Sequence, residues 1–463
     1  MQIDNSVGAE ELVPRLERLW EVSGPKVRWL CDHYPPEEGS PVFTEAGRYR
    51  TKGWTEWTQG FLYGWAILQF DATGDRAFLE AGRRGTVEHM ASHVSHMGVH
   101  DHGFNNVSTY GNLRRLMLEG RIERDDWELA FYEMALKASG AVQAARWQRT
   151  ADGGGYIYTF NGPHSLFVDT MRSLRSLGLA HRLGHRLMGE NDEAISLLAR
   201  AVQHAMTTAT YSVYYGEGRD IYDVAGRTTH EALFNVNDGR YRCPSTQQGY
   251  SPFSTWTRGL AWVMLGFAEQ LEFLATVPDD ELDDLGGRAA IQGWMERAAR
   301  VACDFYLAST PADGIPYWDT AAPGLAALGD YLARPADPFN EHEPVDSSAA
   351  AIGAQGLLRF GHVVATSDPE GGARYRQAGL TILRRLLEEP YLSLDPDHQG
   401  LLLHGVYHRP GGWDHVSSSR TVPSGESVMW GDYHLAELAL YAQRLLRGEP
   451  YYAFFGPEGD DRE

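Results

Sequence analysis

Two aspartates stand in local settings where a carboxylate could do chemistry. Asp101 lies between two histidines in the segment His100–Phe104, and Asp169 lies within the apolar segment Leu166–Met171. A carboxylate on an apolar segment is either paired or has its pKa raised by desolvation. Helix capping explains each aspartate equally well, because Asp is a favoured N-cap residue. A metal site is less favoured at His100–His102, since adjacent residues point in different directions and no third ligand lies nearby.

The densest group of polar and aromatic residues lies between Thr229 and Trp262, with His230 and Gln248 inside it. Arg258 and Trp262 are four residues apart, so on a helix they share one face. A guanidinium beside an indole suits a ring that bears a carboxylate, because the indole stacks and the guanidinium binds the acid. The alternative is an ordinary arginine lying on a core tryptophan. The adjacent Gly259 and the amide-rich approach favour a binding site.

Two further segments begin predicted helices. The small residues of Val345–Ala351 allow close packing, with Asp346 or Ser347 as the cap, so we interpret that segment as architectural. Met429–Glu437 is either structural or part of the mouth of a site. No phosphate-binding loop, Ser-His-Asp arrangement or cysteine nucleophile is present. The remaining set of two carboxylates, a histidine, an arginine and several tryptophans can supply acid and base for cleaving glycosides.

Helical periodicity runs through most of the chain and predicts an all-α protein. The predicted helices cover Glu10–Val22, Thr58–Leu68, Asn105–Leu118, Asp125–Ser139, Asp192–Thr207, Thr255–Leu274, Arg288–Leu307, Ser347–Phe360, Ala373–Leu387 and Ser427–Leu446. Tyr156–Phe160 is the best candidate strand and indicates a local hairpin. Helices joined by long Gly- and Pro-rich loops favour a closed α/α barrel of helical hairpins, with an open helical solenoid as the alternative, although no repeat is visible. In such a barrel the loops form the active-site mouth.

Composition sets outer limits on the function. The 463 residues show no linker, so we expect one catalytic domain over 1–463, with a lead-in helix and loop over about 1–50. The net charge of −21 argues against nucleic acid and anionic membranes as partners, but not against a small acidic ligand. Three scattered cysteines, an N-terminus without an apolar signal region and the lack of a long apolar run predict a cytoplasmic protein.

The motifs together resemble glycoside hydrolase family 88, the unsaturated glucuronyl hydrolases. They occur in family order over roughly Gly53 to Leu446 as Trp57–Phe61, His100–Phe104, Val168–Met171, Thr229–His230, Gln248–Tyr250, Ser254–Gly259 with Trp262, Asp346–Ala349, and Trp430–Tyr433. The ordered set is much more specific than any one motif.

The resemblance implies an (α/α)6 barrel of six helical hairpins and a reaction without metal or cofactor. The substrate would be a small oligosaccharide that ends in a 4,5-unsaturated glucuronic acid, such as a glycosaminoglycan disaccharide made by a lyase. Enzymes of this family hydrate the C4=C5 vinyl ether; the resulting hemiketal opens and the remaining sugar leaves.

The resemblance also assigns roles by position. Asp169 matches the residue that protonates C4 and activates the water, and Asp101 matches the assisting carboxylate. Protonating carbon requires a protonated acid, so we expect burial and a second carboxylate to raise the pKa of Asp169. An anion such as Asp101 would stabilise the oxocarbenium character that develops next to the ring oxygen. The expected substrate-binding residues are Trp57, His100, Trp147, His230, Gln248, Arg258 and Trp262.

Two segments are longer than the family pattern, 147–164 and 211–229, and both could reshape the rim of the cleft. Three other functions remain open at this point. They are an unsaturated rhamnogalacturonyl hydrolase of family 105 acting on pectin fragments, a conventional inverting glycosidase acting on saturated glucuronides, and a sugar-binding protein without catalysis. The oligomeric state, the sugar after the uronate and the tolerance for sulfate are not predicted.

Overall fold

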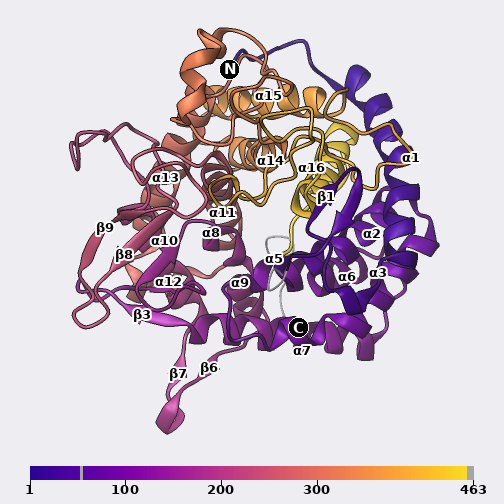
Figure 1. Cartoon of the computed structure of the whole chain (residues 1–463). Coiled ribbons are helices and arrows are strands. Elements are labelled where there is room, and N and C mark those ends of the chain that lie inside the picture. The colour runs from indigo at the N-terminus through magenta and orange to yellow at the C-terminus, as the bar shows by residue number, and fades with distance from the viewer. Residues whose placement is uncertain (53–55, 456–463) are drawn as a thin grey trace.

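A closed ring of helices surrounds the axis of the molecule in the computed structural model, which describes residues 1–52 and 56–455 (Figure 1). The inner ring consists of α2 (Gln59–Thr73), α5 (His102–Asn106) continued by the π-helical turn η3 (Val107–Gly111) and α6 (Asn112–Leu118), α8 (Thr170–Ser173) with α9 (Arg175–Arg182), α11 (Thr257–Leu274), α14 (Ser347–Val363) and α16 (Met429–Arg447). Each inner unit contacts the next, and α16 contacts α2, so the ring closes.

A second ring of helices packs outside the first. It consists of α1 (Ala9–His33), α3 (Arg76–His89), α7 (Asp126–Ala145), α10 (Leu197–Tyr211), α13 (Arg288–Ser309) and α15 (Pro369–Leu386), with α4 (Ala91–Val94) and α12 (Asp279–Leu282) as short additions. Each outer helix contacts an inner one, as α13 does with α11 and α15 with α14. The (α/α)6 barrel expected from the sequence is therefore confirmed, and the open solenoid is excluded.

The two rings differ in sequence because they differ in burial. Helices α11, α14 and α16 are buried around nearly their whole circumference, and α14 begins with the small residues Ser347–Ala351. The outer helices bury a single face, as the buried positions of α13 show. Glycines allow the inner helices to approach each other. A Cβ at Gly103 would lie under 3.0 Å from the backbone of Ser173, and one at Gly356 would collide with Leu265.

Four small antiparallel sheets accompany the helices of the barrel in the part of the chain that the structure describes. The predicted hairpin is confirmed in a shorter form, since β3 (Trp147–Arg149) pairs with β4 (Gly155–Ile157). No sequence pattern indicates the three-stranded sheet of β5 (Ser165–Phe167), β8 (Glu231–Phe234) and β9 (Tyr241–Ser245). The other two pairs are β1 (Phe43–Glu45) with β2 (Arg48–Arg50), and β6 (Leu187–Met188) with β7 (Ala194–Ile195).

Several helix predictions need correction. The helix predicted over Asp192–Thr207 begins later, at Leu197, because a 3-10 turn and β7 precede α10. Helices α3 and α9 were not predicted at all. The first 50 residues are not a lead-in, because α1 packs on α2 and α16 as a member of the outer ring. The strand β1 also bridges to Val428 directly before α16.

A buried ionic cluster joins three inner helical units. Arg172 of α8 is paired with Glu269 of α11 and with Glu437 of α16, and all three side chains are buried. Arg175 of α9 lies 3.5 Å from the second carboxylate oxygen of Glu437. The hydroxyl of Tyr452, in the segment that follows α16, also donates to Glu437. Burial lowers the pKa of Arg172 to about 9. The charge of Arg175 lowers it as well, and the charge of Glu437 opposes both effects.

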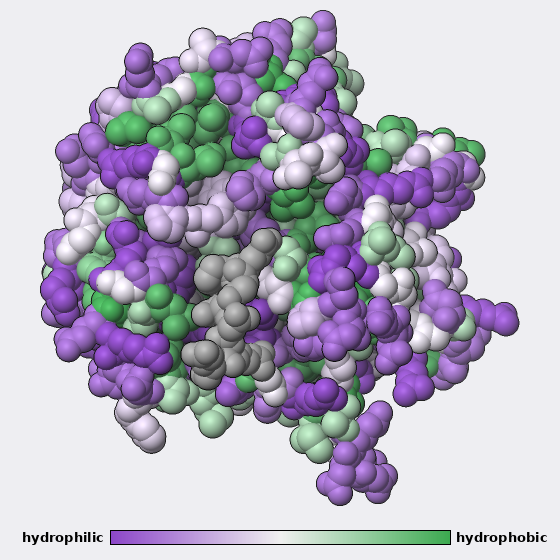
Figure 2. All heavy atoms as spheres, turned by 180° about the vertical axis from the view of Figure 1, so that it is seen from behind, coloured by the Kyte–Doolittle hydropathy of each residue, from purple (hydrophilic) through white to green (hydrophobic). Residues whose placement is uncertain are grey.

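The outer surface is mostly polar. Figure 2 shows the face opposite to that of Figure 1, where hydrophilic residues predominate and apolar residues form separate patches. Within residues 1–52 and 56–455, no helix combines the length and the apolar character that a membrane span needs.

Replacing Glu437 by Gln should lower the free energy of unfolding by about 3–5 kcal/mol, because two buried guanidinium groups lose their shared counter-charge. The exposed pair of Glu217 and Arg297 provides the control, and Glu217→Gln should cost about 1 kcal/mol or less. Urea denaturation followed by circular dichroism measures both. Equal effects of the two changes would show that the cluster does not hold the inner ring together.

Candidate active site

A cavity opens at one end of the inner ring. It is lined by aromatic side chains, two carboxylates and several nitrogen donors. The lining residues are Trp57, His96, Val99, His100, Asp101, Phe104, Asn105, Phe160, Phe167, Asp169, Gln247, Gln248, Trp256, Arg258, Trp262, Tyr407, His408 and Trp413. The aspartates predicted to act together therefore share one cavity, although 68 residues separate them.

The sheet β5–β8–β9 brings three distant segments to the same place. In the register of the sheet Phe167 pairs with Glu231, which in turn pairs with Ser245. The backbone N–H of Val168 also donates to the carbonyl of His230 at 3.0 Å. The residues just beyond these paired positions are Asp169, His230 and Gln247. Strand pairing thus places an acid, an imidazole and an amide side by side.

His100 lies between the two aspartates. Its Nε2 is 3.2 Å from Oδ1 of Asp169 and 3.6 Å from Oδ1 of Asp101, and the imidazole is buried. The backbone of this segment is fixed, because the carbonyl of His100 accepts hydrogen bonds from Gln143 and Ser173. His102 has a structural role, since its ring nitrogens bond to Ser139 and to the carbonyl of His96.

The electrostatics of this group divide the two carboxyls. Burial raises the pKa of Asp101, the charge of Asp169 adds to that effect, and His100 opposes it. Burial alone would also raise the pKa of Asp169, but the hydrogen bond and charge of His100 outweigh it, so the pKa is lowered. The prediction that Asp169 has a raised pKa is therefore wrong for the ligand-free protein. The reason is that the imidazole bonds to Asp169 more closely than to Asp101.

Of the three aspartates for which helix capping was considered, only Asp346 caps its helix. Asp346 accepts hydrogen bonds from the backbone N–H groups of Ser348 and Ala349 at the start of α14, which confirms its architectural interpretation. Asp101 before α5 and Asp169 before α8 make no capping hydrogen bond. The capping explanation thus fails for the two cavity aspartates, and their carboxylates are left to the cavity and to His100.

Arg258 is held by protein groups on all sides. One terminal nitrogen binds Asp346 at 2.9 Å and the carbonyl of Val406; the other binds Oε1 of Gln248 at 2.9 Å and the carbonyl of Tyr407 at 2.8 Å. Only 2% of Arg258 is exposed. Arg258 therefore orients Gln248, whose Nε2 becomes the end available to a ligand.

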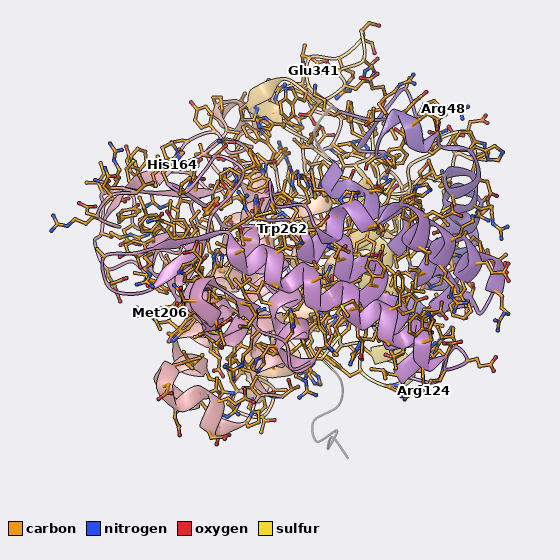
Figure 3. All side chains as sticks on the ribbon, turned by 90° about the horizontal axis from the view of Figure 1, so that it is seen from below. Arg48, Arg124, His164, Met206, Trp262 and Glu341 are labelled. Atoms are coloured by element: carbon orange, nitrogen blue, oxygen red, sulfur yellow. The ribbon has the colours of Figure 1, made fainter. Side chains whose placement is uncertain are left out.

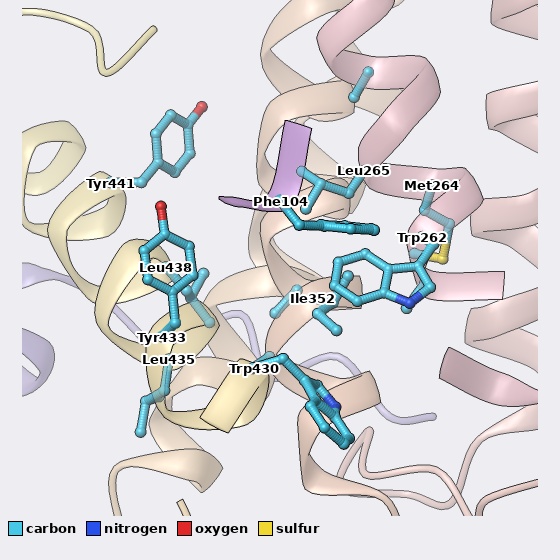
Figure 4. Close-up of a cluster of buried hydrophobic side chains, with 14 of the residues drawn as sticks. Phe104, Trp262, Met264, Leu265, Ile352, Trp430, Tyr433, Leu435, Leu438 and Tyr441 are labelled. Carbon is cyan, nitrogen blue, oxygen red and sulfur yellow. The ribbon is translucent and has the colours of Figure 1, made fainter. Parts of the chain in front are cut away.

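The aromatic partners of Arg258 also differ from the prediction. Its guanidinium lies over the rings of Trp256 and Trp430, at 4.6 and 4.9 Å, and not over Trp262 as the four-residue spacing predicted. Trp262 instead packs against Phe104 (Figure 4), and its ring also lies edge-on to that of His434. It still lines the cavity, deep in the barrel (Figure 3).

His230 lies behind the cavity wall, where its ring packs against the lining residues Phe167 and Trp256 and does not itself line the cavity. Its Nδ1 accepts a hydrogen bond from the backbone N–H of Gln247 at 3.0 Å. Burial lowers the pKa of His230 to about 3, so the ring is neutral and carries its proton on Nε2. This buried Nε2 has no protein partner, and the charge of Asp169 acts on the ring. His230 is therefore positioned as a hydrogen-bond donor beside Asp169.

The other two predicted aromatic residues, Trp57 and Trp147, lie in different places relative to the cavity. Trp57 lines the cavity and stacks on Trp430, with ring centres 4.9 Å apart. Trp147 does not line it; its indole lies in β3 under the guanidinium of Arg200 at 4.1 Å. The assignment of Trp147 to the cleft was therefore wrong, because the β3–β4 hairpin turns it toward α10. The same long segment instead contributes Phe160 to the cavity.

A loop that no sequence motif predicted brings Tyr407, His408 and Trp413 to the cavity. Asp414 shapes this loop by accepting hydrogen bonds from the backbone N–H groups of Tyr407 and His408. Burial raises the pKa of Asp414 to about 6. A run of aromatic residues in a Gly-rich connector was the only available signal. Asp432, in the segment Met429–Glu437, is structural. Its carboxylate accepts hydrogen bonds from the backbone N–H groups of Leu401 and Leu402 and from the hydroxyl of Tyr49.

Metal-ligating residues do not gather in the described part of the chain. Within residues 1–52 and 56–455, no three or more His, Cys, Asp or Glu side chains are grouped so that they could hold a metal ion.

A helical barrel with two carboxylates in an aromatic cavity is typical of a glycoside hydrolase. Comparisons with known proteins identify which glycoside hydrolases this chain is similar to. An unsaturated glucuronyl hydrolase from Bacillus sp. (strain GL1) is 28% identical over 412 residues, covering 86% of this chain and 89% of that protein. An unsaturated chondroitin disaccharide hydrolase from Streptococcus pyogenes serotype M1 is 25% identical over 424 residues, covering 90% and 88%.

Solved structures agree in fold. The crystal structure of an unsaturated glucuronyl hydrolase specific for heparin has a TM-score of 0.71 at 20% identity, covering 94% of this chain and 98% of that one. The structure of the Bacillus sp. GL1 enzyme has a TM-score of 0.68 at 23% identity, covering 95% and 97%. No family model matches the chain. The sequence relatives and structural neighbours are unsaturated glucuronyl hydrolases, which confirms the resemblance to glycoside hydrolase family 88.

Replacing Asp101 by Asn should lower the pKa of His100. Burial opposes the charged imidazole, but Asp101 and the hydrogen bond to Asp169 together raise the pKa above its ordinary value. Removing the negative charge of Asp101 therefore destabilises the protonated ring. Titration of histidine ring signals by NMR, with His100→Gln to assign the signal, measures the shift. Glu281→Gln, which removes the carboxylate paired with His181, is the control. An unchanged His100 titration in Asp101→Asn would contradict the proposed coupling.

Proposed function

We propose that this chain is a glycoside hydrolase that releases a terminal 4,5-unsaturated glucuronic acid from lyase-generated oligosaccharides. The observation that carries the proposal is the pair Asp101 and Asp169, bridged by His100, at the base of an aromatic cavity. Similarity to enzymes named for this activity supports it. One structural neighbour, from a Streptococcus, is complexed with dGlcA-GalNAc6S, so glycosaminoglycan disaccharides are the first substrate class to test.

In the proposed reaction, water adds across the C4=C5 bond of the uronate. Asp169 delivers a proton to C4 and assists the water that attacks C5; the hemiketal at C5 then opens and the sugar on C1 leaves. The pKa of Asp169 is lowered by the hydrogen bond and charge of His100, so the proposed role requires substrate binding to raise it. The arriving uronate adds a negative charge and excludes water, and both effects raise the pKa of a neighbouring carboxyl.

Asp101 and the donors around the ring complete the proposed site. A negative charge on Asp101 would stabilise the positive charge that develops at C5 and the ring oxygen. The hydrogen-bond donors are His230 Nε2, which lies beside Asp169, and the amide of Gln248, which is placed for the uronate. Trp57 and Trp262 provide apolar walls. Arg258 acts through Gln248 as a positioning residue.

The organisation of the chain fits one catalytic unit, which we also propose. A single hydrophobic cluster runs from Val7 to Phe455 and includes members of every helix of the inner ring. The proposed location is the cytoplasm, in keeping with three cysteines that are all free thiols.

Replacing Asp169 by Asn should reduce turnover roughly 10²–10⁴-fold, because an amide can neither donate an acidic proton nor activate water. Loss of the ultraviolet absorbance of the conjugated uronate measures turnover on lyase products of chondroitin, heparin, hyaluronan, gellan and pectin. Asp238→Asn, at the exposed turn between β8 and β9, should keep full activity.

Each contrary result of that assay points to one alternative. Activity restricted to the pectin fragments would favour an unsaturated rhamnogalacturonyl hydrolase. Cleavage of a saturated glucuronide without loss of absorbance would mean a conventional glycosidase. Binding without any cleavage would mean a sugar-binding protein. Full activity of Asp169→Asn would remove this residue from the mechanism.

Replacing Gln248 by Glu should raise KM roughly 10–100-fold with a smaller change in kcat, since a hydrogen bond to a charged group is lost and a like charge replaces it. The new carboxylate would still accept the hydrogen bond from Arg258, so the loop should keep its shape. Gln248→Ala is the matched variant and should raise KM less. If Glu and wild type show equal KM values, the amide does not face the uronate.

A further inference from the structure

We propose that an exposed aromatic platform beside the cavity binds sugar rings beyond the unit that follows the unsaturated uronate. The platform consists of Tyr222, Tyr250 and Phe253, with 51%, 51% and 44% of their surfaces exposed. Tyr222 comes from the long segment 211–229, and the other two come from the turn after β9. The inference deepens the proposed function and rests on it, because it concerns the length of the same substrate.

The turn that carries Tyr250 and Phe253 joins two residues that line the cavity, Gln248 and Trp256. Tyr250 follows the cavity residue Gln248 by two positions, and Phe253 precedes the cavity residue Trp256 by three. Since consecutive Cα atoms are about 3.8 Å apart, Tyr250 lies within about 8 Å of Gln248 and Phe253 within about 12 Å of Trp256. A short oligosaccharide that leaves the cavity spans such a distance.

The turn that carries Tyr250 and Phe253 is fixed from below. The buried carboxylate of Asp319 accepts hydrogen bonds from the backbone N–H of Tyr250 at 2.9 Å and from the hydroxyl of Ser254 at 3.0 Å. Ser251 closes the turn by accepting from the N–H of Phe253 at 3.1 Å. The ring of Phe253 is thus exposed on a rigid support.

The loop that carries Tyr222 is fixed to the same turn. Buried Arg227 is paired with Asp220 at 2.7 Å, and its other terminal nitrogen donates to the carbonyl of Phe253 at 3.1 Å. Asp223 accepts three backbone N–H groups of the loop, from Gly216, Glu217 and Arg219. As a result the rings of Tyr222 and Phe253 lie 5.2 Å apart at an angle of 38°.

This arrangement favours a carbohydrate ligand. Aromatic rings held exposed by buried polar groups cost little conformational entropy on binding, so contact area converts efficiently into affinity. Tyrosine offers an apolar face together with a hydroxyl that can bond to a sugar hydroxyl. The rings of the platform are uncharged, and the nearby guanidinium of Arg227 is already paired with Asp220, which fits uncharged sugar faces more closely than sulfate or carboxylate groups.

The test compares unsaturated disaccharides and tetrasaccharides prepared with one lyase from whichever polysaccharide the absorbance assay selects. Wild type should show a kcat/KM on the tetrasaccharide roughly tenfold above that on the disaccharide, as expected for one or two stacking contacts. The double variant Tyr222→Ala/Phe253→Ala should lose this preference and keep its disaccharide kcat/KM within about twofold. Trp127→Ala, which removes an 85% exposed aromatic from α7, should change neither value.

The outcomes separate the two proposals. Unchanged disaccharide turnover in the double variant shows that it is folded, so an equal length preference in variant and wild type would overturn the platform. Equal kcat/KM on both lengths for wild type would overturn the platform too. A double variant that differs from wild type only in its sedimentation coefficient would also overturn it and would indicate an interface between copies of the chain. No absorbance loss on any substrate would instead refute the proposed function.

Discussion

The ion pairs of Arg172 set the frame on which the rest of the structure depends. Three inner helical units meet at this side chain, through Glu269 of α11 and Glu437 of α16. Charges at zero exposure are tolerated only when each is paired and hydrogen-bonded, so the positions of these helices relative to one another are narrowly limited. Since α8 follows directly from Asp169, the same constraint fixes the floor of the cavity and the direction in which this carboxylate points.

Above this floor, the chemistry depends on how one imidazole is shared. His100 stabilises the charged form of Asp169 more than that of Asp101, and burial is left to raise the pKa of Asp101. The two carboxyls therefore differ in proton affinity, in the order opposite to the one that the proposed reaction needs, so the bound uronate has to reverse it. The sheet β5–β8–β9 adds a neutral His230 behind the cavity wall, and the Gln247 hydrogen bond to Nδ1 leaves its single N–H on Nε2. The polar lining is therefore preorganised before any ligand arrives.

Local patterns predicted much of the fold. Helices such as α11, α13 and α14 were found within a few residues, because an amphipathic or wholly apolar period of 3.6 is written into consecutive residues. Helix α9 was missed because it is short and begins at Arg175, an ion-pair residue that looks polar in sequence and is buried in the structure. The strands β5, β8 and β9 are three to five residues long, and the pairing of β5 with β8 joins segments more than 60 residues apart, so no local pattern reports the sheet.

The sequence by itself determined the barrel class, the family resemblance and the two aspartates that share the cavity. It could not decide what each polar residue does, because Asp101, Asp169 and Asp346 stand in the same local context before a helix. Only the tertiary structure separated them: Asp346 caps α14 and pairs with Arg258, 88 residues away, while the other two meet at His100. The same holds for Trp147, which a hairpin turns away, and for the platform of Tyr222 and Phe253. Roles of this kind come from distances and desolvation between remote segments, and these quantities do not exist until the chain is folded.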